Sequence, residues 1–167
     1  EQLGRALFLG KAKCAACHLI KGKKPLFTDF TYDNLGIPRN PENPASIADP
    51  AWADPGLGGF LKHAGYGDDI YGAEWGKHKV PTLRNVDLRP DGLVKAYGHN
   101  GYFKSLLEIV HFYNTRDVPG EAWPAPEVPE TVNTAEMGDL GLSLKEEKAI
   151  VAFMKTLSDG YVPDGKK

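Results

Sequence analysis

The sequence predicts an all-α fold with long loops, and three observations support this prediction. Near the C-terminus, Ser143 and Glu146 precede an apolar stripe at helical spacing. Ser105 and Glu108 precede a second stripe in the same way. A serine followed three residues later by glutamate is a capping box, which satisfies free backbone donors at the start of a helix. The third observation is that no segment alternates apolar and polar residues as a half-buried strand does.

Helical periodicity predicts one helix before residue 14, one after residue 105 and one after residue 143. The first, within residues 2–13, ends at Gly10, and the last ends at the turn signal Asp159-Gly160. We expect the apolar side chains of these helices to form the core. They are Leu3, Leu7 and Phe8, then Leu106, Ile109, Val110 and Tyr113, then Ile150, Phe153, Met154 and Leu157.

The stretch Cys14-Ala15-Ala16-Cys17-His18 carries the chemistry of the chain. Two cysteines with two residues between them, followed at once by histidine, form the attachment sequence of a c-type haem. The thiols bind the two vinyl groups of the haem, and the adjoining imidazole becomes an axial ligand of the iron. A zinc half-site would need further ligands, and these are the only cysteines of the chain. A redox dithiol would lie in a βαβ context, which is not found here. The sequence therefore predicts one covalent haem c held by Cys14, Cys17 and His18.

Two segments are expected to lack regular structure. Glycine and proline recur between residues 21 and 79, yet eight aromatic residues in this segment argue against a solvated linker. A loop of this length is normally functional or disordered. We expect it to wrap the haem, which supplies the missing apolar core. Residues 118–129 contain Trp123 among four prolines and are expected to form an extended surface excursion.

Composition limits the partners of the protein and its environment. The chain has 167 residues, of which 41% are hydrophobic and 25% charged, as in one globular domain spanning residues 1–167. A net charge of -2 argues against a nucleic-acid partner, and no apolar run is long enough to span a bilayer. The chain opens without a signal peptide, so we expect a mature or trimmed form. Because c-type haem is attached outside the bacterial cytoplasm, a periplasmic protein is expected.

Seven short stretches carry a family resemblance: GRALF at 4–8, FTD at 27–29, DNLG at 33–36, PTLRNV at 81–86, YGHNG at 97–101, FYN at 112–114 and IVAF at 150–153. Together they resemble the C-terminal haem domain of the bacterial di-haem cytochrome c peroxidase and MauG family. The resemblance implies a cytochrome c-like fold, in which the helix before the haem motif and the C-terminal helix cross and brace the haem. Two departures stand out. The family carries two haems, and it often has Pro-Tyr-Met-His or Pro-Tyr-Phe-His where this chain has Ala96-Tyr97-Gly98-His99.

The resemblance also supplies a candidate for the second axial position of the iron, opposite His18. Tyr113 falls where the peroxidases carry an axial methionine and MauG an axial tyrosine, and the alternative is a core tyrosine. Met137 is the rival, because small cytochromes c place their methionine ligand shortly before the last helix. A methionine ligand raises the reduction potential, a tyrosine oxygen favours ferric iron, and an open position admits peroxide.

The remaining histidines could also bind iron. We expect His63 and His78 at the surface, and we expect His111 to point away from the helix face of Tyr113. The resemblance places His99 near the haem, with a structural or propionate hydrogen bond. Arg84 is a candidate partner for a propionate, because a guanidinium matches carboxylate geometry. Its alternative role is that of a surface arginine.

The sequence leaves three functions open. The first is a mono-haem c-type cytochrome that transfers electrons through Fe(III)/Fe(II), with a small redox protein or another electron donor or acceptor as partner. The second is a peroxidase or MauG-like haem enzyme, or the electron-relay half of a di-haem peroxidase. The third is a redox or small-ligand sensor. The single haem motif favours the first, and the family resemblance supports the second.

Overall fold

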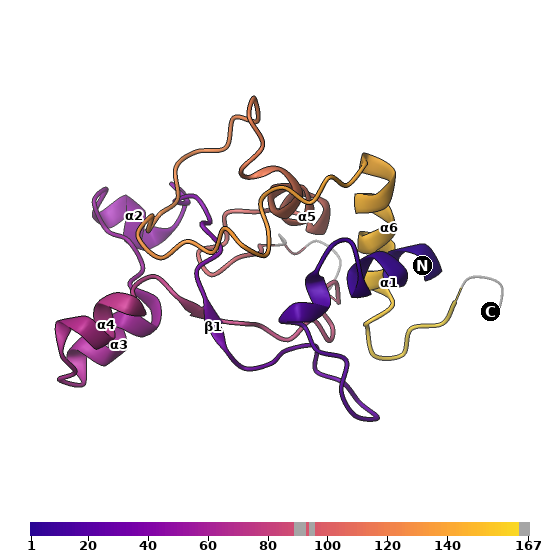
Figure 1. Ribbon diagram of the computed structural model, residues 1–167, viewed down its shortest axis with the longest axis horizontal. Coiled ribbons are helices and arrows are strands. Elements are labelled where there is room, and N and C mark those ends of the chain that lie inside the picture. Colours follow the sequence, from indigo (N-terminus) through magenta and orange to yellow (C-terminus); the bar gives the residue numbers. More distant parts are fainter. Residues whose placement is uncertain (89–92, 94–95, 164–167) are drawn as a thin grey trace.

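The computed structural model describes residues 1–88, 93 and 96–163. The regular structure of these residues is mostly helical, with one small sheet, which corrects the strictly all-α prediction. Helices α1, α5 and α6 gather at one end of the molecule and α2, α3 and α4 at the other (Figure 1). In chain order the elements are α1 (Gln2–Leu9), the 3-10 turn η1 (Cys14–Ala16), β1 (Tyr32–Asp33), α2 (Pro44–Ala48), α3 (Gly56–His63), α4 (Asp68–Ala73), β2 (His78–Lys79), α5 (Leu106–Thr115) and α6 (Leu144–Lys155).

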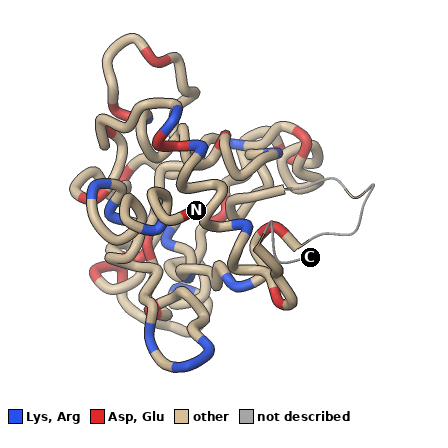
Figure 2. The backbone as a smooth tube through the Cα atoms, turned by 90° about the vertical axis from the view of Figure 1, so that its right-hand side faces the viewer, with Lys and Arg blue, Asp and Glu red and all other residues tan. Residues whose placement is uncertain are grey.

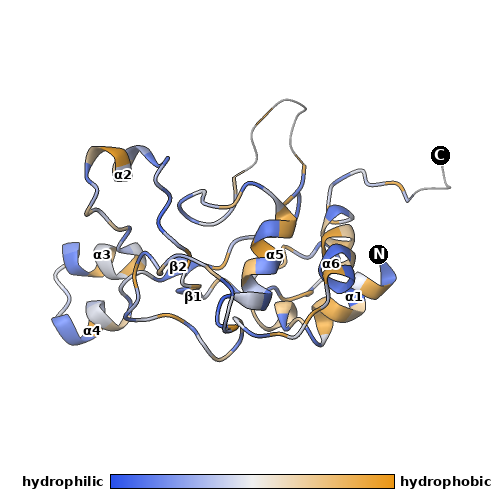
Figure 3. Cartoon of the chain, turned by 90° about the horizontal axis from the view of Figure 1, so that it is seen from above, coloured by the Kyte–Doolittle hydropathy of each residue, from blue (hydrophilic) through white to orange (hydrophobic). Residues whose placement is uncertain are grey.

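Helices α1, α5 and α6 build the core beside the cysteine motif. Each contributes a fully buried side chain: Phe8, Phe112 and Ile150. Gly4 of α1 lies against α6 so closely that a Cβ atom there would be 1.8 Å from the carbonyl oxygen of Ala149. The first and last helices therefore pack in backbone contact, which agrees with the crossing that the family resemblance implies, and Figure 3 shows them side by side with hydrophobic residues on both. No helix within the described residues is long and apolar enough to cross a membrane.

Both predicted capping motifs mark the start of a helix. At α6 the Ser143 hydroxyl accepts a hydrogen bond from the Glu146 N–H, and the Glu146 carboxylate accepts one from the Ser143 N–H. At α5 the Ser105 hydroxyl caps the Glu108 N–H in the same way. The Glu108 carboxylate, however, accepts from the N–H of Lys104 instead of that of Ser105. A cap of this kind contributes about 1 kcal/mol to stability.

The prediction of little regular structure between residues 21 and 79 is wrong, because this segment contains α2, α3, α4 and both strands. Asn43 caps α2, with Pro44 at its first position. A Cβ atom on Gly58 of α3 would lie 2.6 Å from the backbone of both Tyr71 and Trp75. Glycine is a weak helix former. Because Gly58 has no side chain, the backbone of α3 can pack closely against α4 and the residues after it. This tertiary packing outweighs the low helix propensity of glycine.

The two strands join the ends of this segment next to the cysteine motif. They run antiparallel, with Tyr32 opposite Lys79 and Asp33 opposite His78. The segment lines the cavity described below only near these ends, at Asp33, Leu35, Ile37, His78 and Lys79. Helices α2, α3 and α4 come between the two strands in the sequence and lie on the side of the molecule opposite α1 and α6 (Figure 1), where α3 packs against α4.

The proline-rich segment 118–129 is anchored to the core. The Trp123 indole N–H donates to the hydroxyl of Thr115 at 3.0 Å. Its ring also packs edge-on against Phe103 and Phe112. Val128, at the other end of the segment, is buried. Apolar side chains therefore anchor the excursion at its middle and near its C-terminal end.

The contact at Gly4 generates a stability prediction. Replacing Gly4 with alanine should lower the free energy of unfolding by more than about 2 kcal/mol, because α1 and α6 must separate to admit a methyl group. Denaturant unfolding measures this loss. Gly72→Ala in α4 is the matched control, because no atom lies within 4 Å of a Cβ atom there. That substitution should leave stability unchanged or raise it by up to about 1 kcal/mol. Equal effects at both positions would contradict the backbone contact.

Candidate cofactor site

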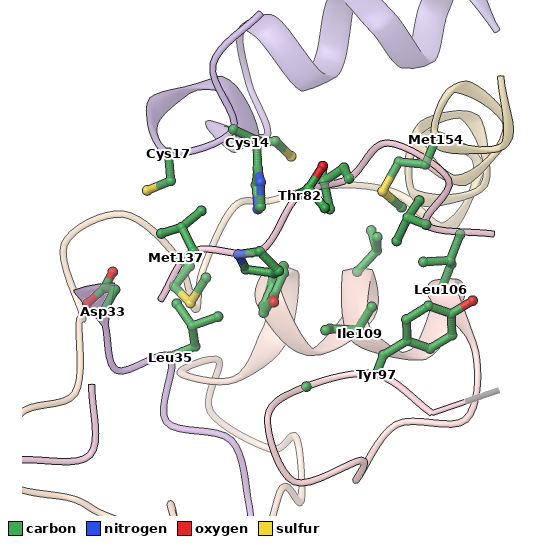
Figure 4. Close-up of a pocket in the computed structure, with 18 of the residues that line it drawn as sticks. Cys14, Cys17, Asp33, Leu35, Thr82, Tyr97, Leu106, Ile109, Met137 and Met154 are labelled. Atoms are coloured by element: carbon green, nitrogen blue, oxygen red, sulfur yellow. The ribbon is translucent and has the colours of Figure 1, made fainter. Parts of the chain in front are cut away.

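A cavity of about 480 Å³ lies between the cysteine motif and α5. This volume is within the range of about 300–1,000 Å³ typical of small-molecule and cofactor sites. Figure 4 shows Cys14, Cys17 and Thr82 on one wall and Leu106 and Ile109 of α5 on the opposite wall. Further apolar side chains from α1, α5 and α6 complete the lining: Phe8, Val110, Ile150 and Met154. The site therefore suits a mainly apolar group of cofactor size.

All the residues predicted for the site line this one cavity: Cys14, Cys17, His18, Arg84, His99, Tyr113 and Met137. Among the other histidines, His78 also lines it, so the expectation of an ordinary surface residue at this position is wrong. His63 is exposed at the end of α3. His111 lies on the other side of α5, where its Nδ1 is 2.9 Å from the carboxylate of Glu147. Neither His63 nor His111 reaches the cavity.

His18 is held in the orientation that a metal ligand needs. Its Nδ1 lies 2.8 Å from the carbonyl oxygen of Phe27. A proton on Nδ1 makes Nε2 the nitrogen that can bind a metal, and such a bond also strengthens the ligand. Phe27 has a left-handed backbone, with φ 56, which is rare for a bulky residue. Burial lowers the pKa of His18, which favours the neutral imidazole that metals bind.

The two cysteines are free thiols on the turn that precedes His18. The His18 N–H donates to the Cys14 carbonyl at 2.9 Å, which closes this turn. Burial raises the pKa of Cys14 to about 12 and that of Cys17 to about 11, so both thiols are protonated at neutral pH. Within the described residues, no three His, Cys, Asp or Glu side chains are grouped to hold a metal ion, as a zinc site would require. The donor set thus fits a covalent haem better than zinc.

The two candidates for the second axial position lie on connected segments. Tyr113 belongs to α5, and burial raises its pKa. Met137 lies in the loop before α6, and Figure 4 shows it on the side of the cavity near Cys17 and Leu35. The N–H of Gly138 donates to the carbonyl of Tyr113 at 2.7 Å, so the loop is fixed to α5 beside the candidate tyrosine. Both side chains line the cavity, and the choice between them stays a prediction.

Arg84 and His99 have protein partners at the edge of the cavity. The Arg84 guanidinium lies 2.8 Å from the carboxylate of Asp159. His99 Nε2 lies 2.8 Å from the carboxylate of Glu127, and its ring stacks on His78 with centroids 3.7 Å apart. Burial and the neighbouring His99 lower the pKa of His78. Contacts of Arg84 and His99 with haem propionates stay a prediction.

Arg116, which the sequence analysis did not single out, holds the cavity wall together. Its side chain is only 5% exposed. It donates to the carbonyl oxygens of Leu35 and Asn133, each at 2.8 Å, and both of these residues line the cavity. It also pairs with Asp117 at 2.6 Å. The residue just after a helix gives no signal of such distant partners, so only the tertiary structure reveals them.

Curated proteins provide a direct comparison, although no family model matches the chain. The chain is 34% identical to the methylamine utilization protein MauG of Paracoccus denitrificans, over 95% of this chain and 42% of MauG. It is 33% identical to the cytochrome-c peroxidase IdrP1 of Denitromonas iodatirespirans, over 94% of this chain and 40% of that protein. The chain is related to MauG and the cytochrome-c peroxidases. It spans about two fifths of the length of these relatives.

Solved structures show the same relationship. The diheme peroxidase BthA of Burkholderia thailandensis has a TM-score of 0.75 at 26% identity, over 99% of this chain and 45% of BthA. A MauG-like protein associated with microbial copper homeostasis has a TM-score of 0.54 at 20% identity, over 95% of this chain and 46% of that protein, and supports the fold alone. The family resemblance inferred from the seven sequence stretches is therefore confirmed.

The bonds of Arg116 generate a second prediction. Arg116→Lys should lower the free energy of unfolding by about 2–3 kcal/mol, because lysine keeps the charge but cannot reach several acceptors with a planar fork. Denaturant titration of the haem-loaded protein measures the loss. Arg5→Lys, at an exposed position of α1, is the control and should change stability by less than about 0.5 kcal/mol. An unchanged unfolding midpoint in Arg116→Lys would remove Arg116 from this role.

Proposed function

We propose that this chain holds one haem c and transfers single electrons as its iron cycles between Fe(III) and Fe(II). One observation supports this most strongly. The attachment motif, the fixed imidazole of His18 and two candidate axial ligands, Tyr113 and Met137, line the same cavity. Relatives that are named cytochrome-c peroxidases or a diheme peroxidase add independent support for haem.

The residues of the chain have distinct roles in this proposal. When bound, haem c supplies the one-electron chemistry. Cys14 and Cys17 would hold it covalently, and His18 would bind one side of the iron. The hydrogen bond to the Phe27 carbonyl would orient the imidazole of His18 and strengthen it as a ligand. The apolar walls from α1, α5 and α6 would keep water from the iron.

A second function is favoured by the length of the relatives. The chain spans about two fifths of MauG and of IdrP1, and its structural relative BthA is a diheme peroxidase. The second candidate is therefore the electron-relay half of a di-haem enzyme, in which another haem unit would react with peroxide. In both cases the partner would be a small redox protein or another electron donor or acceptor. Covalent haem attachment would place the protein in the periplasm.

Haem content tests the first proposal directly. Produced with a haem-attachment system, the protein should have the mass of the polypeptide plus one haem, and its colour should survive denaturation and washing with acid acetone. Cys14→Ala/Cys17→Ala should lose the colour under the same treatment, because no thioether can form. Mass spectrometry and the haem absorption spectrum give the readouts.

The same preparation separates the two functions. Added peroxide should leave the spectrum of a six-coordinate electron carrier nearly unchanged. Rapid consumption of peroxide with a reduced donor by the isolated chain would contradict the electron-transfer proposal. A bare polypeptide mass would contradict both functions.

The second axial ligand is tested by paired substitutions. We expect Tyr113→Phe to change the ferric absorption spectrum, because the phenol oxygen would leave the iron, and Met137→Leu to leave that spectrum unchanged. Met154→Leu is the matched control, because Met154 is a buried core methionine of α6 that also lines the cavity. The opposite pattern, with loss of a weak long-wavelength band in Met137→Leu, would assign the position to Met137.

A further inference from the structure

The loop of residues 19–26, here called the lysine loop, follows the cysteine motif and carries exposed positive charge. Lys21, Lys23 and Lys24 are all exposed. Within the part of the chain that the structure describes, none of their side chains forms an ion pair or hydrogen bond. The loop projects from the lower side of the molecule in Figure 1, and Figure 2 shows basic residues at its tip. Lys24 helps to lower the pKa of the Asp159 carboxyl group, so Lys21 and Lys23 are the cations best placed to meet a partner.

The N-terminal 24 residues, which include all three lysines of the lysine loop, differ in net charge from the rest of the chain. The first 24 residues contain six of the twenty Lys and Arg residues but only one of the twenty-two Asp and Glu residues. Their net charge is +5, against -7 for residues 25–167, which together give the -2 of the chain. Two other lysines of this region already have partners, since Lys11 pairs with Glu146 and Lys13 donates to the carbonyl of Ala135. Positive charge is thus concentrated in the lysine loop.

The base of the lysine loop is bonded to the walls of the cavity. His18 precedes the loop and Phe27 follows it, and the bond between His18 Nδ1 and the Phe27 carbonyl closes it. The Leu83 N–H donates to the Leu26 carbonyl at 3.2 Å, and Leu83 lines the cavity. Two apolar side chains of the loop, Ile20 at 37% and Leu26 at 45%, are exposed. The surface beside the proposed haem therefore combines apolar contacts with a cationic rim.

We propose that the lysine loop, with Ile20 and Leu26, is the docking surface for a small redox protein that presents a carboxylate-rich face. This inference rests on the proposed electron-transfer function. Opposite charges would steer the two proteins together, and the small apolar contact would suit a weak, transient complex. One electron would leave the partner and reduce Fe(III) of this chain to Fe(II), or pass in the reverse direction, so no further reactant is needed. The net charge of -7 over residues 25–167 favours an acidic partner at this loop over the rest of the chain.

Binding of an acidic probe tests the surface without electron flow. The probe is oxidised plant-type ferredoxin, a small acidic iron–sulfur protein, titrated into the haem-loaded ferric protein and followed by NMR chemical shifts. We expect binding at low ionic strength that weakens as salt is added, because salt screens exposed charges. Lys21→Glu/Lys23→Glu should raise the dissociation constant at low salt at least about tenfold.

Lys62→Glu/Lys104→Glu is the matched control, because it makes the same change in net charge at two exposed lysines. Lys62 belongs to α3, at the far end of the molecule in Figure 1, and Lys104 pairs with Glu42. This variant should change the dissociation constant by less than about threefold. If Lys21→Glu/Lys23→Glu does not fold, as circular dichroism would show, Lys23→Gln alone should weaken binding about threefold.

Several outcomes would overturn the docking surface. They are equal weakening in both double variants, ferredoxin binding that strengthens with salt, and binding to vesicles of anionic lipid without binding to ferredoxin. Failure of the proposed function gives a different result. In that case the protein would lack covalent haem, or its iron would not cycle with dithionite and ferricyanide, whatever the salt dependence of ferredoxin binding.

Discussion

The hydrogen bond between His18 and the Phe27 carbonyl is the contact on which the site depends. It orients the imidazole with the proton on Nδ1, and its acceptor, Phe27, has a left-handed backbone. The next residue, Thr28, donates its hydroxyl proton to the Val80 carbonyl at 2.7 Å, which connects the motif to the segment after β2. A strained backbone persists only where the surrounding structure determines it strongly. Here the short sheet and the bonds at the base of the lysine loop provide that support.

The sequence predicts the parts of this site that depend on local chemistry. The cysteine motif, the caps at Ser105 and Ser143, and the helix face that carries Tyr113 all depend on residues within one or two turns, so spacing alone predicts them. The cavity-lining position of His78 and the bonds of Arg116 could not be predicted, because their partners lie far away in the chain. Helix α3 could not be predicted for a related reason. Gly58 has low helix propensity, and the helix is stabilised by its close backbone packing against Tyr71 and Trp75.

The two candidate functions place the same demands on the cavity. Both need iron in an apolar site, and the walls that would exclude water come from this chain itself, through Phe8, Val110 and Ile150. The contact of Gly4 with Ala149 sets the distance between α1 and α6, which supply two of those walls. A second haem unit would add its own reaction site to the one proposed for this cavity. The difference between the two functions lies in the second axial position and in the partner.

In the proposals above, choice of partner and binding of iron would depend on separate residues. None of the three lysines of the lysine loop lines the cavity, whereas every residue predicted for the haem site does. Exposed charges act over about 10 Å and weaken with salt, while partly buried groups such as His18 are screened less. Substitutions in the loop can thus change which protein docks without changing the ligands of the iron. Because His18 and Phe27 close the base of the loop, the docked partner would nevertheless lie close to the proposed haem.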